Sequence, residues 1–129
     1  MMQLTASIVI YNNDLRTLER AMASFIAGFI FGRQAVEILW YLMPSRFTWT
    51  LSLPLQFCDI APWIAAIALL TEARWARILL YYWGTALCTQ AFFTPTLSEG
   101  LAHTRFWWFW LGHTHIVGAA IYDLVARGF

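Results

Sequence analysis

The stretch PLQFCDIAPWIAAIALLT, from Pro54 to Thr71, decides the fold class that the sequence predicts. Apart from Asp59 near its start, it carries no charged side chain and is largely apolar. A helix that crosses a bilayer needs roughly 17 to 25 such residues, because its backbone polar groups must be satisfied within the segment. Pro54 suits the first turn of a helix, where its missing N–H costs nothing. The stretch therefore predicts a transmembrane helix.

Three further stretches have the same character. They cover about residues 22–43, 78–94 and 106–125, and prolines stand just after the first two. The chain is 60% hydrophobic and 18% aromatic over 129 residues, and a chain of this length has too little interior to bury so much apolar surface. We therefore predict an all-α, polytopic membrane bundle of about four transmembrane helices, with the lipid bilayer as its main partner.

The arginines predict the orientation of this bundle. Basic residues concentrate on the cytoplasmic side of a membrane protein. Five arginines fall on one side of the predicted spans and two on the other; the five are Arg16, Arg20, Arg74, Arg77 and Arg127, and the two are Arg46 and Arg105. Both termini are thus predicted to be cytoplasmic. Residues 1–21 form a cytoplasmic N-terminal segment, and the first helix is expected to extend into it from Asp14, with Asn13 as its cap.

Composition and motif spacing exclude several functions. A formal net charge of +1 leaves no basic face for nucleic acid. His113 and His115 are two residues apart on a helix, so they point to nearly opposite faces and cannot bind one metal ion together. P-loop, dinucleotide-binding and serine-nucleophile motifs are absent from the sequence. We predict no metal and no cofactor.

Small residues recur on one face of the first predicted span. Ser24, Gly28 and Gly32 are each four residues apart, a spacing that lets a second helix approach closely. The stripe has two interpretations. It packs within the bundle, or it supports helix–helix self-association through Gly28 and Gly32.

Polar side chains occur at a similar depth in all four predicted spans. At roughly 1.5 Å of rise per residue, they lie roughly 6 to 10 Å below the outer ends of their helices. Polar groups inside a span are costly and need partners or a water-filled cavity. The sequence therefore predicts one outward-opening polar pocket. Its predicted residues are Glu37, Gln56, Cys58, Asp59, Gln90, His113 and His115.

Each of these residues also has a structural interpretation. Arg33 and Glu37 are spaced i,i+4 and can pair along their own helix. Asp59 can interact favourably with the helix dipole if it lies near a helix start. Cys58 is either a small packed thiol or a nucleophile, and His113 is the best candidate for its base. Pro62 cannot donate to the carbonyl of Cys58, which favours a cavity beside that residue.

Three motifs in order carry a family resemblance. LPLQFCDIAPWIAAIALLT, YYWGTALCTQAFFTPTL and FWWFWLGHTHIVGAAIYDL are similar to segments of the YwaF-like bacterial integral membrane proteins, over about residues 35–129. The resemblance implies a multi-pass protein of the bacterial plasma membrane. It also implies a distant relation to proteins linked to phospholipid acyl transfer, where a membrane cysteine is the nucleophile. Cys58 and His113 fit the family pattern, whereas Gln56 replaces a histidine and Thr114 a glycine.

The N-terminal stretch resembles a different family. SIVIYNN followed by DLRTLERAMASF, within about residues 4–25, is similar to the start of a family 2 glycosyltransferase. Those enzymes hold a metal and a diphosphate with a DxD pair, and the three aspartates here are not spaced that way. We therefore interpret residues 1–21 as a glycosyltransferase-like remnant without that activity, joined to a membrane domain over residues 22–129.

Three hypotheses about function follow. In the first, the chain is an intramembrane lipid-modifying enzyme that transfers an acyl group, with Cys58 as nucleophile and His113 as general base. In the second, it is a transport or accessory membrane subunit whose polar groups conduct a small solute or protons. In the third, it is an inactive fragment of a longer membrane protein, because members of the resembling family have more spans.

Overall fold

The structure is a computed structural model that describes residues 2–45, 47, 49 and 56–128, with side chains described from Tyr11 onward. Two predictions made from the sequence concern residues outside this range. They are the start of a helix at Pro54 and the side of the membrane on which Arg46 lies.

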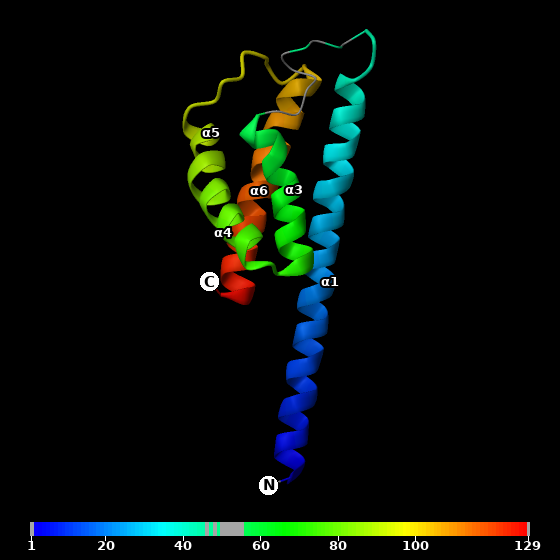
Figure 1. Cartoon of the computed structure of the whole chain (residues 1–129), viewed down its shortest axis with the longest axis vertical. Helices are drawn as coiled ribbons and strands as arrows, with labels where there is room; N and C mark the ends of the chain where they lie inside the picture. The colour runs from blue at the N-terminus through cyan, green and yellow to red at the C-terminus, as the bar shows by residue number, and fades with distance from the viewer. Residues whose placement is uncertain (1, 46, 48, 50–55, 129) are drawn as a thin grey trace.

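Four helical rods make up the described part of the chain (Figure 1). The first is α1, Met2–Tyr41, and the second is α3, Phe57–Thr71. The third contains α4, Arg74–Tyr82, the π-helical segment η1, Trp83–Cys88, and α5, Thr89–Phe93. The fourth is α6, Thr104–Arg127. Within the described residues the elements are all helical, which confirms the predicted fold class.

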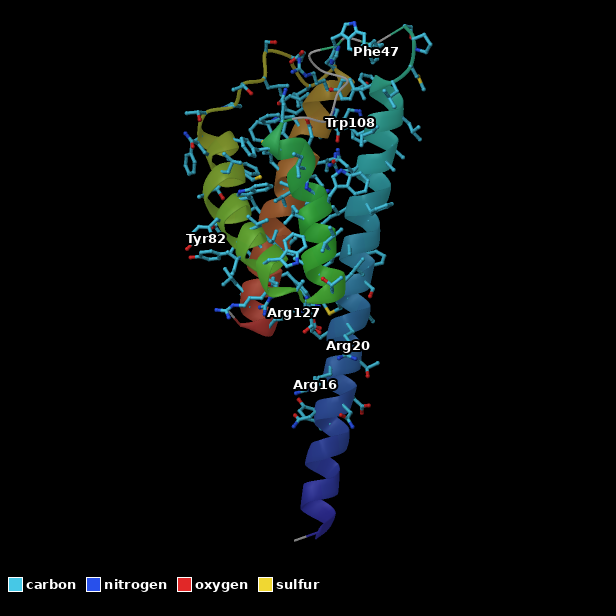
Figure 2. The ribbon with its side chains drawn as sticks, in the orientation of Figure 1. Arg16, Arg20, Phe47, Tyr82, Trp108 and Arg127 are labelled. Carbon is cyan, nitrogen blue, oxygen red and sulfur yellow. The ribbon has the colours of Figure 1, made fainter. Side chains whose placement is uncertain are left out.

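The rods alternate in direction, so both chain ends lie toward the same end of the molecule (Figure 1). The labelled Arg16, Arg20 and Arg127 lie toward that end, whereas Phe47 and Trp108 lie at the other (Figure 2). The arrangement agrees with the asymmetry of arginines in the sequence. Which end faces the cytoplasm stays a prediction.

The N-terminal half of α1 extends well beyond the other three rods (Figure 1). The expected helix start at Asp14 with an Asn13 cap is wrong, because α1 begins at Met2 and runs without a break to Tyr41. Asn13 is an interior helix residue whose carbonyl accepts a hydrogen bond from Thr17 Oγ1 at 2.9 Å. Propagating a helix adds one backbone hydrogen bond per residue, so continuation through Asn13 is favoured over a new start.

One described helical segment, Tyr11–Tyr41, is long and apolar enough to cross a bilayer by length and composition. The helix α3 is also apolar but shorter. The third rod covers the predicted span 78–94 but changes helix type within it. A four-span arrangement in the bilayer therefore stays a prediction.

Small side chains let the rods approach closely. Alanines of α1, α3, α4 and α6 are almost completely buried, and a few larger side chains fill the space between them. The most buried apolar residues include Ala23, Ala27, Ile30, Ala65, Ala68, Leu69, Ala76, Leu80, Ile116 and Ala120.

The small-residue stripe of α1 does not take part in this core. Ser24, Gly28 and Gly32 are exposed, and a Cβ atom added at either glycine would meet nothing within 4 Å. The prediction that the glycines pack within the bundle is therefore wrong in the described structure. Alanines at positions 23 and 27 form the buried face instead. Self-association through Gly28 and Gly32 stays a prediction.

A buried arginine joins the rods at the end where the chain termini lie. Arg127, with its side chain 7% exposed, places Nε 2.6 Å from a carboxylate oxygen of Glu19 in α1. Its Nη2 and Nη1 donate to the carbonyls of Leu69 and Ala68 at 2.9 and 3.3 Å. These carbonyls belong to the last turn of α3, and the Ala68 carbonyl also accepts from the Glu72 N–H at 3.0 Å. Arg127 therefore connects α6 to α1 and to the C-terminal end of α3.

A second arginine extends this cluster to the third rod. Arg77 of α4 places Nε 2.8 Å from Asp123 in α6, and it also donates to the carbonyl of Gly128. Asp123 lies 3.5 Å from Arg127, so one carboxylate faces both arginines. Tyr122 donates to the Glu19 carbonyl at 2.9 Å. We call Glu19, Arg77, Asp123 and Arg127 the arginine cluster.

Replacing Arg127 with glutamine should lower stability strongly. The change leaves the Glu19 and Asp123 carboxylates without their shared cation, and removing one partner of a buried ion pair typically costs about 3 kcal/mol or more. The exposed Arg20 provides the matched control. In unfolding titrations with a denaturing detergent, Arg127→Gln should unfold at a clearly lower denaturant fraction than the parent, while Arg20→Gln should match the parent. Equal midpoints for the two variants would contradict the bridging role.

Candidate functional site

A pocket of about 350 Å³ lies between the rods, at the end opposite the arginine cluster. Trp108, one of its lining residues, lies at the far end of the bundle from Arg127 in Figure 2. Its size falls within the range of small-molecule sites. Polar lining residues are Arg33, Gln34, Glu37, Tyr41, Gln56, Cys58, Asp59, Gln90, Thr94, Thr96, Arg105, Trp108 and His113.

Six of the seven predicted pocket residues line this one cavity; they are Glu37, Gln56, Cys58, Asp59, Gln90 and His113. His115 is not among the lining residues. It packs edge-on against Phe29 of α1, with ring centroids 4.9 Å apart. The reason is helical phase, since a residue two positions from His113 points to nearly the opposite face of α6. The six residues that share one cavity were grouped by similar depth alone, which could not place His115; that they form a functional site stays a prediction.

Cys58 and His113 line the same pocket. Cys58 lies in the first turn of α3 and is partly buried, whereas His113 lies midway along α6 and is 7% exposed. The thiol and the imidazole interact electrostatically. The two residues come from separate rods, so packing between α3 and α6 places them together.

The second ring nitrogen of His113 fixes its tautomer. Nδ1 lies 2.7 Å from the carbonyl oxygen of Phe109, one turn earlier in α6. A carbonyl can only accept, so in the neutral ring Nδ1 carries the proton and Nε2 is left to accept from the Cys58 S–H. The rings of Phe109 and His113 also pack with centroids 4.3 Å apart. His113 is thus held in the orientation and tautomer of a general base.

Both predicted structural roles of the neighbouring charges are confirmed. Arg33 Nη1 lies 2.6 Å from Glu37 Oε2 along α1, as the i,i+4 spacing predicted. Asp59 lies in the first turn of α3 and accepts a hydrogen bond from the Gln56 N–H at 3.2 Å. Carboxylates are favoured there by the helix dipole. The carboxylates of Glu37 and Asp59 therefore already make contacts that stabilise the walls of the pocket.

Arg33 is positioned by a glycine next to His113. A Cβ atom added at Gly112 would lie 3.4 Å from Arg33 Nη2 and 3.5 Å from Cζ, so the guanidinium packs directly over the glycine. Arg33 also donates to Gln34 at 2.7 Å. Arg33 Nε and Trp108 Nε1 are buried and have no partner among the described residues. The lining residues therefore include two buried N–H donors that can meet an acceptor.

The rim of the pocket carries a partly buried ion pair. Arg105, at the start of α6, places Nη1 2.7 Å from Glu99 Oε1 in the preceding loop. Partial desolvation raises the pKa of the Glu99 carboxyl, but the hydrogen bond and charge of Arg105 outweigh it and hold this pKa below its ordinary value. Arg105 places a positive charge at the mouth of the pocket.

Sequence reasoning missed several lining residues. Arg33 was interpreted only as the partner of Glu37, and Arg105 only through orientation. Thr96 follows Pro95 after the third rod and was not considered. The polar residues of the loop after the third rod were the sequence signal that could have indicated these lining residues.

The π-helical segment η1 shapes the wall of the site. Its wider turn is a rare form that is found frequently at functional sites. The Gly84 carbonyl in η1 accepts a hydrogen bond from Thr89 Oγ1 at 3.0 Å. Gly84 is also where η1 meets α6 most closely, because an added Cβ would lie 2.6 Å from Ala120 Cβ and 3.3 Å from the Ile116 carbonyl. The segment ends at Cys88, which is completely buried.

The fold and the site together define a class: a helical membrane-protein bundle with a polar pocket at one end, where a cysteine from one helix meets a histidine from another. A family model agrees with this class. The TMEM164 family, a family of membrane proteins, matches residues 2–129, and the chain belongs to it. The match includes the N-terminal stretch and gives no support to the glycosyltransferase resemblance. Neither the curated proteins nor the solved structures gave a match.

Replacing Gly84 with alanine should weaken the contact between η1 and α6. The new methyl group collides with Ala120, and overpacking of this kind typically costs about 1 to 3 kcal/mol. Gly118 of α6 is the matched control, since a Cβ there meets nothing within 4 Å. Gly84→Ala should lower the detergent-unfolding midpoint, Gly118→Ala should not, and Gly84→Ala with Ala120→Gly should recover part of the loss. Absence of recovery in the double variant would show that the close approach is not the cause.

Proposed function

We propose that this chain is an intramembrane acyl-transfer enzyme in which Cys58 is the nucleophile and His113 the general base. The single observation that carries the proposal is that these two side chains, from two different helices, line the same polar pocket. A nucleophile within reach of a base that a third group orients is the pattern of nucleophilic catalysis, and the Phe109 carbonyl is the third group here.

The proposed reaction has two steps. The Cys58 sulfur attacks the carbonyl carbon of an acyl ester while its proton passes to His113 Nε2. The carbon–oxygen bond of the ester then breaks, and the leaving alkoxide takes the proton from His113, which releases an alcohol and leaves a thioester on Cys58. In the second step His113 removes the proton of an acceptor hydroxyl, which attacks the thioester and returns the thiol.

Other features of the pocket support ester chemistry. Arg33 Nε and Trp108 Nε1 are buried donors without partners among the described residues, and ester and carboxyl oxygens are acceptors that could use them. Away from the pocket mouth the rods are packed by alanines and by Leu69 and Ile116 at 1% exposure or less. A pocket closed below and polar above suits binding of an acyl ester whose polar part remains near the mouth.

The proposal also covers the family resemblance, the location and the membrane topology of the chain. We propose a YwaF-like, multi-pass protein of a bacterial plasma membrane with four spans and cytoplasmic termini, in which the pocket opens toward the outer leaflet. The alternating rods and the Arg16, Arg20 and Arg127 positions at one end support it (Figure 2). An inactive fragment remains the competing interpretation, and the labelling experiment below distinguishes the two.

An acyl thioester should accumulate on Cys58 when the protein meets an activated acyl donor. Protein in lipid nanodiscs is incubated with p-nitrophenyl esters of fatty acids, and acylated peptides are mapped by mass spectrometry with and without hydroxylamine. The parent should carry a hydroxylamine-sensitive acyl group on Cys58. His113→Gln should reduce its formation by about 100-fold or more, the usual size of a general-base contribution.

His115→Gln is the matched control, because His115 lies on the opposite face of α6 and packs against Phe29. This variant should acylate like the parent. Equal acylation of His113→Gln and His115→Gln would contradict a base role for His113. Acylation of Cys88 in preference to Cys58, or of neither cysteine, would contradict the enzyme proposal itself.

A transport role is the second candidate. It is favoured by one observation, which is that Glu37, Asp59 and His113 line the same cavity. Ionisable groups inside a membrane commonly mark a path for protons or solutes. The acids are engaged with Arg33 and with the α3 start, so this candidate needs those contacts to open during transport.

Proton flux in vesicles separates this candidate from the enzyme. Asp59→Asn keeps an oxygen that can cap α3 and removes the charge, so a transport role predicts slower acidification of vesicles that enclose a pH-sensitive dye. Cys58→Ser should leave the flux unchanged. Unchanged flux in Asp59→Asn, or loss of flux only in Cys58→Ser, would eliminate transport through this carboxylate.

A further inference from the structure

Arg33 is a buried cation in the wall of the pocket, and the two proposed chemical steps assign it no role. It comes from α1, it is 8% exposed, and it lines the same cavity as Cys58 and His113. An arginine side chain is always charged in a protein, and it donates hydrogen bonds but cannot accept them. The pocket therefore holds a fixed positive charge from a third helix, in addition to the residues of α3 and α6.

The acceptors of α1 use only part of this guanidinium. Nη1 lies 2.6 Å from Glu37 Oε2, and Nη2 donates to Gln34 Oε1 at 2.7 Å. A guanidinium carries five N–H donors, and Nε of Arg33 is buried without a partner among the described residues. Buried donors in native structures are nearly always paired, so one without an acceptor requires an explanation. An oxygen atom that enters with a ligand is such an acceptor.

The guanidinium is held against the helix that carries the candidate base. A Cβ atom added to Gly112 of α6 would lie 3.4 Å from Nη2 of Arg33 and 3.5 Å from both Cζ and Nη1. Gly112 directly precedes His113 and also lines the pocket. Arg33 is thus fixed from its own helix by Glu37 and Gln34, and from α6 by the residue next to His113.

The second arginine that lines the pocket has a different place. Arg105 lies at the pocket mouth, where its Nη1 is 2.7 Å from Glu99 Oε1. Its charge is therefore engaged by a carboxylate of the loop. Arg33 is the lining arginine that contacts α6 beside His113 and keeps an unpaired donor.

We propose that Arg33 stabilises the negative charge of the tetrahedral intermediate that forms when Cys58 is acylated. This inference rests on the proposed function and names a further catalytic residue for it. The Cys58 sulfur bonds to the ester carbonyl carbon, the π-electron pair moves onto the carbonyl oxygen, and the thiol proton passes to His113. The resulting oxyanion accepts a hydrogen bond from Arg33. The carbonyl then re-forms, the bond to the leaving oxygen breaks, and His113 protonates the leaving alcohol.

A purely structural role is the alternative, because Arg33 and Glu37 form a buried ion pair. Replacing Arg33 alone leaves the Glu37 carboxylate buried and unpaired, which can destabilise the fold by itself. A double variant, Arg33→Gln with Glu37→Gln, removes both charges together. A structural role predicts that acylation recovers in the double variant, whereas the oxyanion role predicts that it stays low.

The test compares two reactions of Cys58 in the full chain in nanodiscs. A p-nitrophenyl ester of a fatty acid acylates the thiol through an oxyanion, whereas iodoacetamide alkylates it by displacing iodide, without one. Both rates are read by mass spectrometry. In the double variant the acylation rate should fall about 100-fold, while the iodoacetamide rate should stay within about threefold of the parent. A changed reactivity or accessibility of the thiol would alter both rates alike.

Arg20→Gln is the matched control, because Arg20 is an exposed arginine of the same helix, and it should leave both rates unchanged. The double variant should also keep the parent's detergent-unfolding midpoint. Three results would overturn the inference: parent-like acylation in the double variant, an equal fall of both of its rates, or low acylation together with a clearly lower unfolding midpoint. Absence of Cys58 acylation in the parent would contradict the proposed function itself, and this inference with it.

Discussion

The buried side chain of Arg127 is the constraint on which the rest of the structure depends. It pairs with Glu19 of α1, donates to the last carbonyls of α3 and faces Asp123 of its own helix. Through Asp123 it also meets Arg77 of the third rod. An ion that is removed from water must be paired and fully hydrogen-bonded to be tolerated. These contacts fix the relative heights of all four rods at one end.

The axial positions of the rods at the arginine cluster determine which side chains come together at the other end of the bundle. From the arginine cluster, α3 and α6 run alongside each other, packed by alanines that leave little freedom to slide. The same register brings Cys58, one turn into α3, to His113, midway along α6. The candidate site therefore results from packing between rods rather than from any one local motif.

The sequence predicted the helical class and most of the pocket, for physical reasons that particular residues illustrate. Depth along a helix follows from rise per residue, which is why Glu37, Cys58, Gln90 and His113 could be assigned to one layer. The rotation between His113 and His115 about the helix axis excluded a shared metal site. The same rotation was not considered for the pocket, so His115 was wrongly assigned to it. The spacing of Arg33 and Glu37 and the start of α3 at Asp59 were both visible as local rules.

Other features could not be predicted because they depend on contacts between distant segments. The start of α1 at Met2 required continuation of a helix through a sequence rich in turn-forming residues. The outward direction of Gly28 and Gly32 depends on which face of α1 meets α3, and alanines on the neighbouring face proved to be buried. The π-helical turn from Trp83 to Cys88 was not indicated by any simple periodicity in the sequence.

The central claim is that Cys58 lies in a polar pocket that His113 also lines, while Cys88 is buried outside it. Competitive alkylation of the two thiols tests this claim most directly. Protein in nanodiscs is treated briefly with a small, water-soluble maleimide, and the modified fraction of each cysteine is read by mass spectrometry. The account predicts that Cys58 reacts at least about tenfold faster than Cys88 and slows in His113→Gln. Equal rates at the two cysteines, or an unchanged Cys58 rate in that variant, would contradict it.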